Sequence, residues 1–337
     1  MLSRVKIQNF KSIGEPGVDL ELKPLTFLVG PNGGGKSNVL DAIVFASHGG
    51  ISRPEFFSFS NYEDIHFRRE NNILSVYVEV EDSDSEMVGG HTFLHENFKQ
   101  NPSPQTPESI SSSFIGKVFP IRATRGIIED SDVPKEADWV WQNGEHTLEI
   151  LERLPDANYR SERMKIQKWV SVFGISEAAA TLAGRSRISG SFSDEILDVA
   201  LNASFASTGS RQVLPLIIQL FWSNPGSIIL IEEPEISLHP ELQIRLLEMF
   251  AEAINESKQI ILTTHSHFLL QAIGYAVHNK WMKADQISVY HVEKGENGTE
   301  VESLALGKNG YIQGWVPSFN KVERRLLKEW AETLPRE

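Results

Sequence analysis

The chain has 337 residues, 40% hydrophobic and 23% charged, which is the composition of an ordinary globular protein with one large or two modest domains. The formal net charge of −13 argues against a broadly basic surface for nucleic acid, and the lack of cysteine excludes disulfides, thiolate zinc sites and cysteine nucleophiles. No apolar run approaches the roughly 20 residues of a membrane-spanning helix. The first residues lack the apolar core of a signal peptide, so we expect a cytoplasmic protein without a membrane partner.

The N-terminal residues carry the alternating pattern of half-buried strands. Residues 2–13 and 18–29 are predicted strands, separated by a Gly- and Pro-rich turn at 14–17. Val18, Leu20 and Leu22 alternate with charged residues, and the stretch 73–81 alternates in the same way. Residues 1–81 are therefore predicted to form an N-terminal lobe built on a mixed sheet.

A glycine-rich loop follows the apolar strand at 25–29. Residues 30–37 are Gly-Pro-Asn-Gly-Gly-Gly-Lys-Ser, which fits the phosphate-loop pattern. Glycines allow backbone N–H groups to crowd around a triphosphate, and the helix predicted from Lys36 adds the positive end of its dipole. Lys36 is expected to reach the β and γ phosphates, and Ser37 to offer its hydroxyl to Mg²⁺. The predicted nucleotide-binding residues of the loop are Asn32, Gly33, Gly34, Gly35, Lys36, Ser37 and Asn38.

The middle of the chain is predicted to be an insertion, residues 82–200, between two halves of one nucleotide-binding fold. Residues 82–117 lack periodicity, and 101–107 is the clearest loop. A strand is expected at 118–123, and 145–200 is expected to be mainly helical. Two groups of basic residues are interpreted as solvated helix faces in preference to phosphate-binding patches: Arg160, Arg163, Lys165 and Lys168, and Lys321, Arg324, Arg325 and Lys328.

The second half of the chain alternates helices and buried strands. Apolar stripes predict helices at 213–221 and 242–254, and short apolar runs predict strands at 227–231 and 259–264. This alternation is typical of a parallel sheet with crossover helices. We therefore expect an α/β fold with a mixed N-terminal sheet, a parallel core sheet and a largely helical insertion. Residues 201–300 would form a C-terminal lobe, and 301–337 a tail with an amphipathic helix through Val322, Leu326, Trp330 and Leu334.

Two carboxylates follow the apolar strand at 228–231. Such a strand delivers Glu232 and Glu233 to the carboxyl edge of a parallel sheet, where α/β proteins bind ligands. Glu232 would support Mg²⁺, directly or through water, and Glu233 would polarise the attacking water as general base. An acidic strand end that caps the next helix is the structural alternative; the phosphate loop upstream favours the catalytic interpretation.

A histidine follows the next buried strand, and a small polar segment precedes the helix at 213. His265 would hydrogen-bond the γ-phosphate or the attacking water. A metal site shared with His267 would need further ligands, which the sequence does not offer at fitting spacing. Ser207 and Gly209 could present a hydroxyl and N–H groups to an anion, although taken alone their segment is a helix N-cap.

Taken together, these segments resemble the ABC-type ATPase heads of the SMC/RecF/OLD group, in an AAA-type, OLD-like branch without a Toprim domain. Residues 5–13 resemble its first strand, 25–37 its Walker A segment, 232–240 its Walker B and D-loop, and 263–266 its switch histidine. Residues 207–210 form a degenerate signature motif. The chain departs from the group in three ways: Glu232 replaces the usual Asp, a Q-loop glutamine has no clear place, and 82–200 lacks coiled-coil heptads.

This resemblance implies a mechanism. Two heads would pair head-to-tail around two Mg²⁺-ATP, with Ser207 and Gly209 of one head on the γ-phosphate held by Lys36 of the other. Hydrolysis, slow and stimulated by a partner, would separate this homodimer. The function expected is an ATPase switch controlling a separate effector, such as a nuclease or toxin in prokaryotic antiphage defence, with nucleic acid as a candidate trigger.

Three alternatives stay open. One is a RecF-like DNA-repair protein that binds DNA in an ATP-dependent manner, against which the acidic balance counts. The second is a transporter ATPase subunit, which the degenerate signature and the insertion disfavour. The third is a nucleotide-binding scaffold without turnover, which Lys36, Ser37 and Glu233 disfavour.

Overall fold

The computed structural model describes residues 1–47, 62–70, 72–81, 87–95, 117–127, 131–132, 137–183, 187–194, 199–314 and 316–333. The predicted loop at 101–107 and Leu334 lie outside these ranges.

The N-terminal lobe is an antiparallel sheet with the strand order β2-β1-β4-β5. Its strands are β1 (Leu2–Gln8), β2 (Val18–Glu21), β4 (Leu74–Glu81) and β5 (Met87–His95). Val18 and Leu20 are buried while Asp19 and Glu21 face solvent, as the alternation in the sequence predicts.

The core of the molecule is a six-stranded sheet with the order β14-β13-β3-β12-β11-β6. The strands are β3 (Leu25–Val29), β6 (Val118–Ile121), β11 (Ile228–Glu232), β12 (Gln259–Thr264), β13 (Ile287–Gly295) and β14 (Gly298–Leu304). All neighbours pair in parallel except β13 and β14. The carboxyl ends of β3, β11 and β12 therefore meet at one edge, which brings the phosphate loop, Glu233 and His265 into one region.

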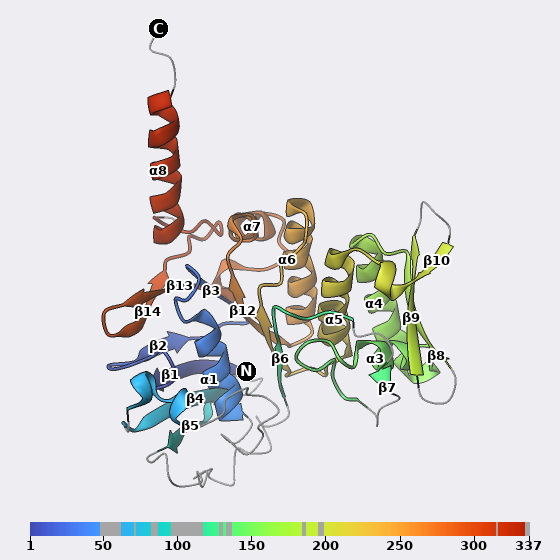
Figure 1. Ribbon diagram of the computed structural model, residues 1–337, viewed down its shortest axis with the longest axis horizontal. Helices are drawn as coiled ribbons and strands as arrows, with labels where there is room; N and C mark the ends of the chain where they lie inside the picture. Colours follow the sequence, from blue (N-terminus) through green and yellow to red (C-terminus); the bar gives the residue numbers. More distant parts are fainter. Residues whose placement is uncertain are drawn as a thin grey trace.

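Successive residues of the core strands face two different hydrophobic clusters. Leu28, Leu230 and Ile261 pack with helix α1 (Lys36–Ser47) and the N-terminal sheet. Phe27, Ile231 and Leu262 pack on the other side. That side is covered by α5 (Thr208–Trp222), α6 (Pro240–Asn255) and α7 (His267–His278), as Figure 1 shows. Because the core strands are buried on both faces, they are continuously apolar.

A smaller unit lies beyond α5 in Figure 1. It holds α3 (Thr147–Arg153), α4 (Arg160–Val172) and a sheet of β7 (Ser131–Asp132), β8 (Glu177–Ala183), β9 (Arg187–Asp194) and β10 (Val199–Asn202). Lys165 and Lys168 of α4 pair with Glu256 and Glu252, both at 2.5 Å, so this part of the first basic group joins α4 to α6 and its C-cap.

This unit differs from the predicted insertion in its limits and content. β5 pairs with β4, and β6 pairs with β11, so both belong to the sheets of the head. β8, β9 and β10 are strands in a part of the chain where a mainly helical segment was expected. The run Glu-Ala-Ala-Ala at 177–180 favours helix locally. In the fold, Ala178 and Ala180 are both buried against α3 and α4, whereas the residues between and before them are more exposed. This packing selects the strand.

The tail carries the predicted amphipathic helix, α8 (Pro317–Thr333), which projects from the body in Figure 1. Val322 and Leu326 are about half exposed, and at the base His267 Nδ1 lies 3.1 Å from Glu323. Short 3₁₀ turns occur at Tyr62–Ile65, Phe67–Arg69, Ala157–Tyr159, Ala203–Phe205 and Ala284–Gln286. Within the described ranges, no helix has the length and apolar character needed to cross a membrane.

Candidate functional site

The glycine-rich loop connects β3 to α1 and is pressed against β13 and β14. A Cβ atom on Gly30 would lie 2.0 Å from the Val292 carbonyl oxygen, and one on Gly35 would lie 2.0 Å from Thr299 Oγ1. Gly33 and Gly35 also have φ angles of 74° and 107°, which favour glycine. Sterics at three positions of the predicted phosphate loop thus require the residue that the sequence places there.

Lys36 lies buried beneath this loop. Its Nζ donates to the carbonyl oxygens of Gly30 at 3.0 Å and Pro31 at 2.9 Å. Burial lowers the pKa of Lys36 to about 8, and the charges of Glu233 and Glu235 oppose this shift. Lys36 and Glu233 therefore lie close enough to interact electrostatically, although they are far apart in the sequence.

The other loop residues form two groups: some are exposed to solvent, and one contacts the N-terminal lobe. Asn32, Gly33 and Ser37 are exposed. The Asn38 amide donates to Ser12 Oγ at 2.6 Å, so this side chain fixes α1 to the lobe. Of the predicted loop residues, Ser37 therefore has the accessible hydroxyl that a phosphate-bound cation needs.

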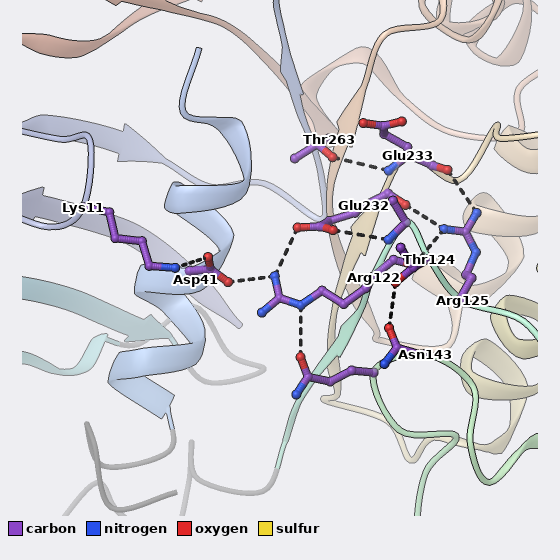
Figure 2. A network of polar contacts seen from close by, with 11 residues as sticks. Lys11, Asp41, Arg122, Thr124, Arg125, Asn143, Glu232, Glu233 and Thr263 are labelled. Atoms are coloured by element: carbon purple, nitrogen blue, oxygen red, sulfur yellow. Dashed lines mark hydrogen bonds and ion pairs between the residues drawn. The ribbon is translucent and has the colours of Figure 1, made fainter. Parts of the chain in front are cut away.

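Glu232 is held in a network that ties β11 to β6 and α1 (Figure 2). Its carboxylate accepts from Arg122 Nη1 at 3.1 Å and from the Ala123 N–H at 3.2 Å. Arg122 also lies 2.7 Å from Asp41, whose other oxygen accepts from Lys11 Nζ at 2.6 Å. Burial opposes the charged form of Arg122, but Asp41 and Glu232 outweigh it and raise its pKa. Both Glu232 oxygens have a protein partner and keep lone pairs for a further donor.

Glu233 has a left-handed backbone, with φ at 43°. Its N–H donates to the Thr263 carbonyl at 3.0 Å, and its Oε1 lies 3.5 Å from His265 Nε2. A non-glycine residue in this region is costly and is held there by its surroundings. The backbone thus directs the carboxylate toward the predicted histidine.

His265 stands directly after β12. Its backbone N–H donates to Glu235 Oε1 at 2.9 Å, and Thr264 Oγ1 donates to the same oxygen at 2.6 Å. Burial, and then the charge of Lys36, lower the pKa of His265, while Glu233 opposes the shift. Neutral imidazole is therefore favoured, with one nitrogen as donor and one as acceptor. In the described part of the chain, no three His, Cys, Asp or Glu side chains gather to hold a metal ion by themselves.

Ser207 is the N-cap of α5, where its Oγ accepts from the Ser210 N–H at 3.1 Å. A Cβ on Gly209 would lie 2.7 Å from the Ser237 carbonyl, so the start of α5 packs on the 235–238 segment. The predicted capping interaction is present. The expected contact of Ser207 and Gly209 with a phosphate held by another head needs a second chain.

Three residues of this region carry no motif in the sequence: Asp41, Arg122 and Arg125. Arg122 and Arg125 stand just after β6, whose pairing with the Glu232 strand becomes apparent only in the folded sheet. The one available signal was a pair of arginines at the end of a predicted strand.

A protein-family model matches residues 25–271, from the phosphate-loop strand to beyond His265. The family is described as an AAA domain, putative AbiEii toxin, Type IV TA system, and the match spans well over half of the chain. This chain belongs to that family. It is an ABC-type ATPase head of the SMC/RecF group, as its sequence motifs predict.

Curated relatives match over short segments. The DNA replication and repair protein RecF of Haemophilus ducreyi is 40% identical over 74 residues, 22% of this chain and 19% of that protein. Exonuclease subunit 2 of phage T4 is 46% identical over 50 residues, 14% of this chain and 9% of that protein. The chromosome partition protein Smc of Methanocaldococcus jannaschii is 48% identical over 44 residues, 13% of this chain and 4% of that protein. The matches thus span a small part of each relative.

Solved structures resemble the chain over most of its length. The SMC head domain from Thermotoga maritima has a TM-score of 0.51 at 15% identity and covers 90% of this chain and 99% of that one. An Smc head bound to the C-winged helix domain of ScpA has a TM-score of 0.59 at 17% identity, covering 91% and 98%. These likenesses confirm the predicted α/β ATPase-head fold.

The lowered pKa of Lys36 predicts that ATP affinity depends on pH. A bound triphosphate favours the charged ammonium and raises its pKa, so binding above about pH 8 requires uptake of a proton. Affinity should be nearly constant a pH unit or more below 8, begin to fall near pH 8, and approach a limiting loss of about tenfold per pH unit above it. Titrations of a fluorescent ATP analogue between pH 7 and 9.5 measure this, with Lys36→Met as control. A flat profile for the wild type would contradict the assignment.

Proposed function

We propose that this chain is an ATP-binding and ATP-hydrolysing switch that dimerises around ATP and controls a separate effector. The observation that carries the proposal is the proximity of Lys36, Glu233 and His265 at the carboxyl edge of the core sheet. A cation for the phosphates, a carboxylate for the attacking water and a histidine beside that carboxylate are the groups that hydrolysis of a triphosphate needs.

The residues have distinct roles in this proposal. Lys36 transfers its hydrogen bonds from the loop carbonyls to the phosphates, Glu233 accepts the proton of the attacking water, and His265 orients that water or the γ-phosphate. Mg²⁺ would neutralise phosphate charge, with Ser37 as ligand and Glu232 as acceptor for its bound water. The exposed Ser37 hydroxyl and the remaining Glu232 lone pairs fit that ion, which usually takes few protein ligands beside phosphate oxygens.

The proposed dimer is supported by the position of Ser207 and Gly209 at the N-terminus of the long helix α5, where an anion can bind. In a head-to-tail pair they would face the γ-phosphate on the other head, so ATP would be part of the interface. Hydrolysis then removes the group that both heads bind.

The names of relatives support a separate effector. One relative is a subunit of an exonuclease, and one similar head was solved bound to another protein. The family description includes a putative toxin of a type IV toxin–antitoxin system. We therefore propose a nuclease or toxin as the controlled partner. A role in antiphage defence, with nucleic acid as trigger, is proposed from the resemblance of the sequence motifs to the SMC/RecF/OLD group.

A pair of variants at Ser207 tests the shared site. Aspartate and asparagine are both good N-caps, so Ser207→Asp and Ser207→Asn should preserve α5. Only the aspartate places a negative charge against the γ-phosphate. We expect Ser207→Asp to lose ATP-dependent dimerisation and roughly 100-fold in hydrolysis, whereas Ser207→Asn stays close to wild type. Light scattering with Mg²⁺-ATP and phosphate release measure both.

Mixing provides the decisive comparison. Ser207→Asp and Lys36→Ala are each inactive alone, but a mixed pair contains one intact shared site, so hydrolysis should return on mixing. A mixture that stays as inactive as its two components, or a Ser207→Asp variant that hydrolyses ATP at the wild-type rate on its own, would contradict the head-to-tail dimer.

A second candidate function is ATP-dependent DNA binding in repair, favoured by the 40% identity with RecF. It predicts duplex binding that requires ATP and weakens steeply with salt. A salt titration on duplex DNA with and without ATP separates it from the switch, for which DNA acts as trigger and changes the rate of hydrolysis.

A further inference from the structure

Arg125 is a buried arginine that belongs to none of the motifs described above. It stands in the loop after β6 and is 1% exposed. All four of its hydrogen bonds to described residues end on backbone carbonyls: Arg122 at 3.2 Å, Glu232 at 2.7 Å, Glu233 at 3.0 Å and Gln212 at 3.0 Å. Burial lowers its pKa to about 10, and Glu235, Glu232 and Glu233 offset part of that effect.

Two of these bonds, to the carbonyls of Glu232 and Glu233, hold the backbone on both sides of the proposed general base (Figure 2). The Glu233 N–H is bound to Thr263 and its carbonyl to Arg125 Nη2, so both sides of this left-handed residue are held. The next residue is Pro234, which disfavours the right-handed helical conformation at Glu233. Without the guanidinium, Glu233 could relax toward extended backbone, and its carboxylate would leave His265.

A third bond reaches the helix of the signature segment. Arg125 Nε donates to the Gln212 carbonyl in the second turn of α5, the helix that Ser207 caps. The same guanidinium therefore contacts the helix proposed to bind the phosphate on a second head and the backbone that aims Glu233. A planar fork with donors on three nitrogens can join these carbonyls, whereas a lysine ammonium is a single point.

We propose that Arg125 is the positioning residue that holds Glu233 in its left-handed conformation and couples it to helix α5. The inference rests on the proposed role of Glu233 in ATP hydrolysis. Contact of α5 with another head's nucleotide would then be transmitted through one buried side chain to the carboxylate that acts on the water.

The test compares Arg125→Lys, Arg125→Gln and Arg125→Met. Each should bind ATP within about threefold of wild type, because none of these changes touches the phosphate loop. Each should lose about 100-fold in kcat with little change in KM, since a displacement of roughly 1 Å at a catalytic group has such an effect. Arg153→Lys is the control, because Arg153 also donates to a backbone carbonyl, that of Ala137, but lies in the smaller unit.

A double-variant cycle separates positioning from general stability. With glutamine at position 233 the base is already absent, so adding Arg125→Lys should lower the residual rate by less than about twofold. Independent losses that multiply would overturn the proposal, and so would failure of all three Arg125 variants to fold and bind ATP. If Glu233→Gln itself leaves hydrolysis unchanged, the proposed function of Glu233 fails instead, which is a distinguishable result.

Discussion

Replacing Glu233 with glutamine is expected to lower the rate of ATP hydrolysis roughly 100-fold or more, the usual contribution of a general base, while ATP still binds. The amide keeps the size and hydrogen-bonding reach of the side chain but cannot accept a proton from water. Because Lys36 and the loop are untouched, ATP should persist in the site. An ATP-dependent dimer should therefore accumulate, measurable by light scattering and by the nucleotide retained after gel filtration.

The matched control is Glu248→Gln on α6, where the carboxylate pairs with Arg245 on the exposed face of the helix. This variant should hydrolyse ATP at the wild-type rate. If Glu233→Gln hydrolyses ATP at the wild-type rate, Glu233 is not the general base. If hydrolysis is lost as expected but no ATP-bound dimer accumulates, the proposed ATP-dependent dimer is contradicted.

Replacing Lys36 with methionine is expected to weaken ATP binding roughly 10- to 100-fold, the range for losing a hydrogen bond to a charged group. Methionine fills a similar volume without a charge. The nucleotide-free protein should not lose stability, because the buried ammonium is unfavourably desolvated, as its lowered pKa shows. The free energy of unfolding should stay equal or rise while ATP affinity falls.

Isothermal titration with ATP and denaturant unfolding of the same samples measure the two effects. Lys328→Met, at an exposed position on α8, serves as control and should change neither. A large loss of stability in Lys36→Met, or undiminished ATP affinity, would contradict the role assigned to the lysine.

Much of the head could be predicted from the sequence because its signals are local. The apolar runs ending at Val29, Glu232 and Thr264 are strands β3, β11 and β12, and the stripes on either side are helices. β13 and β14 were not predicted, although β13 lies beside β3 and presses on the phosphate loop. The Ala-rich strand β8 was missed for a physical reason: its conformation depends on packing against α3 and α4, which local propensity does not include.

In the candidate site, too, some residues could be predicted from the sequence and others could not. Residues in motifs, such as Lys36, Glu233 and His265, could be selected because their spacing reflects backbone geometry. The side chains that hold them could not. Arg125 acts on backbone carbonyls, which every residue has, and Asp41 meets Arg122 only when α1 packs near β6. Such partners become visible when the sheet order is known.

The most direct test of the central claim is a crystal structure of Glu233→Gln with Mg²⁺-ATP. The γ-phosphate should lie between Lys36 Nζ and the side chain at position 233 of one protomer, with Ser207 and Gly209 of a second copy on its far side. A nucleotide bound away from Lys36, or a Lys36 still bonded to the carbonyls of Gly30 and Pro31 beside a bound triphosphate, would contradict it.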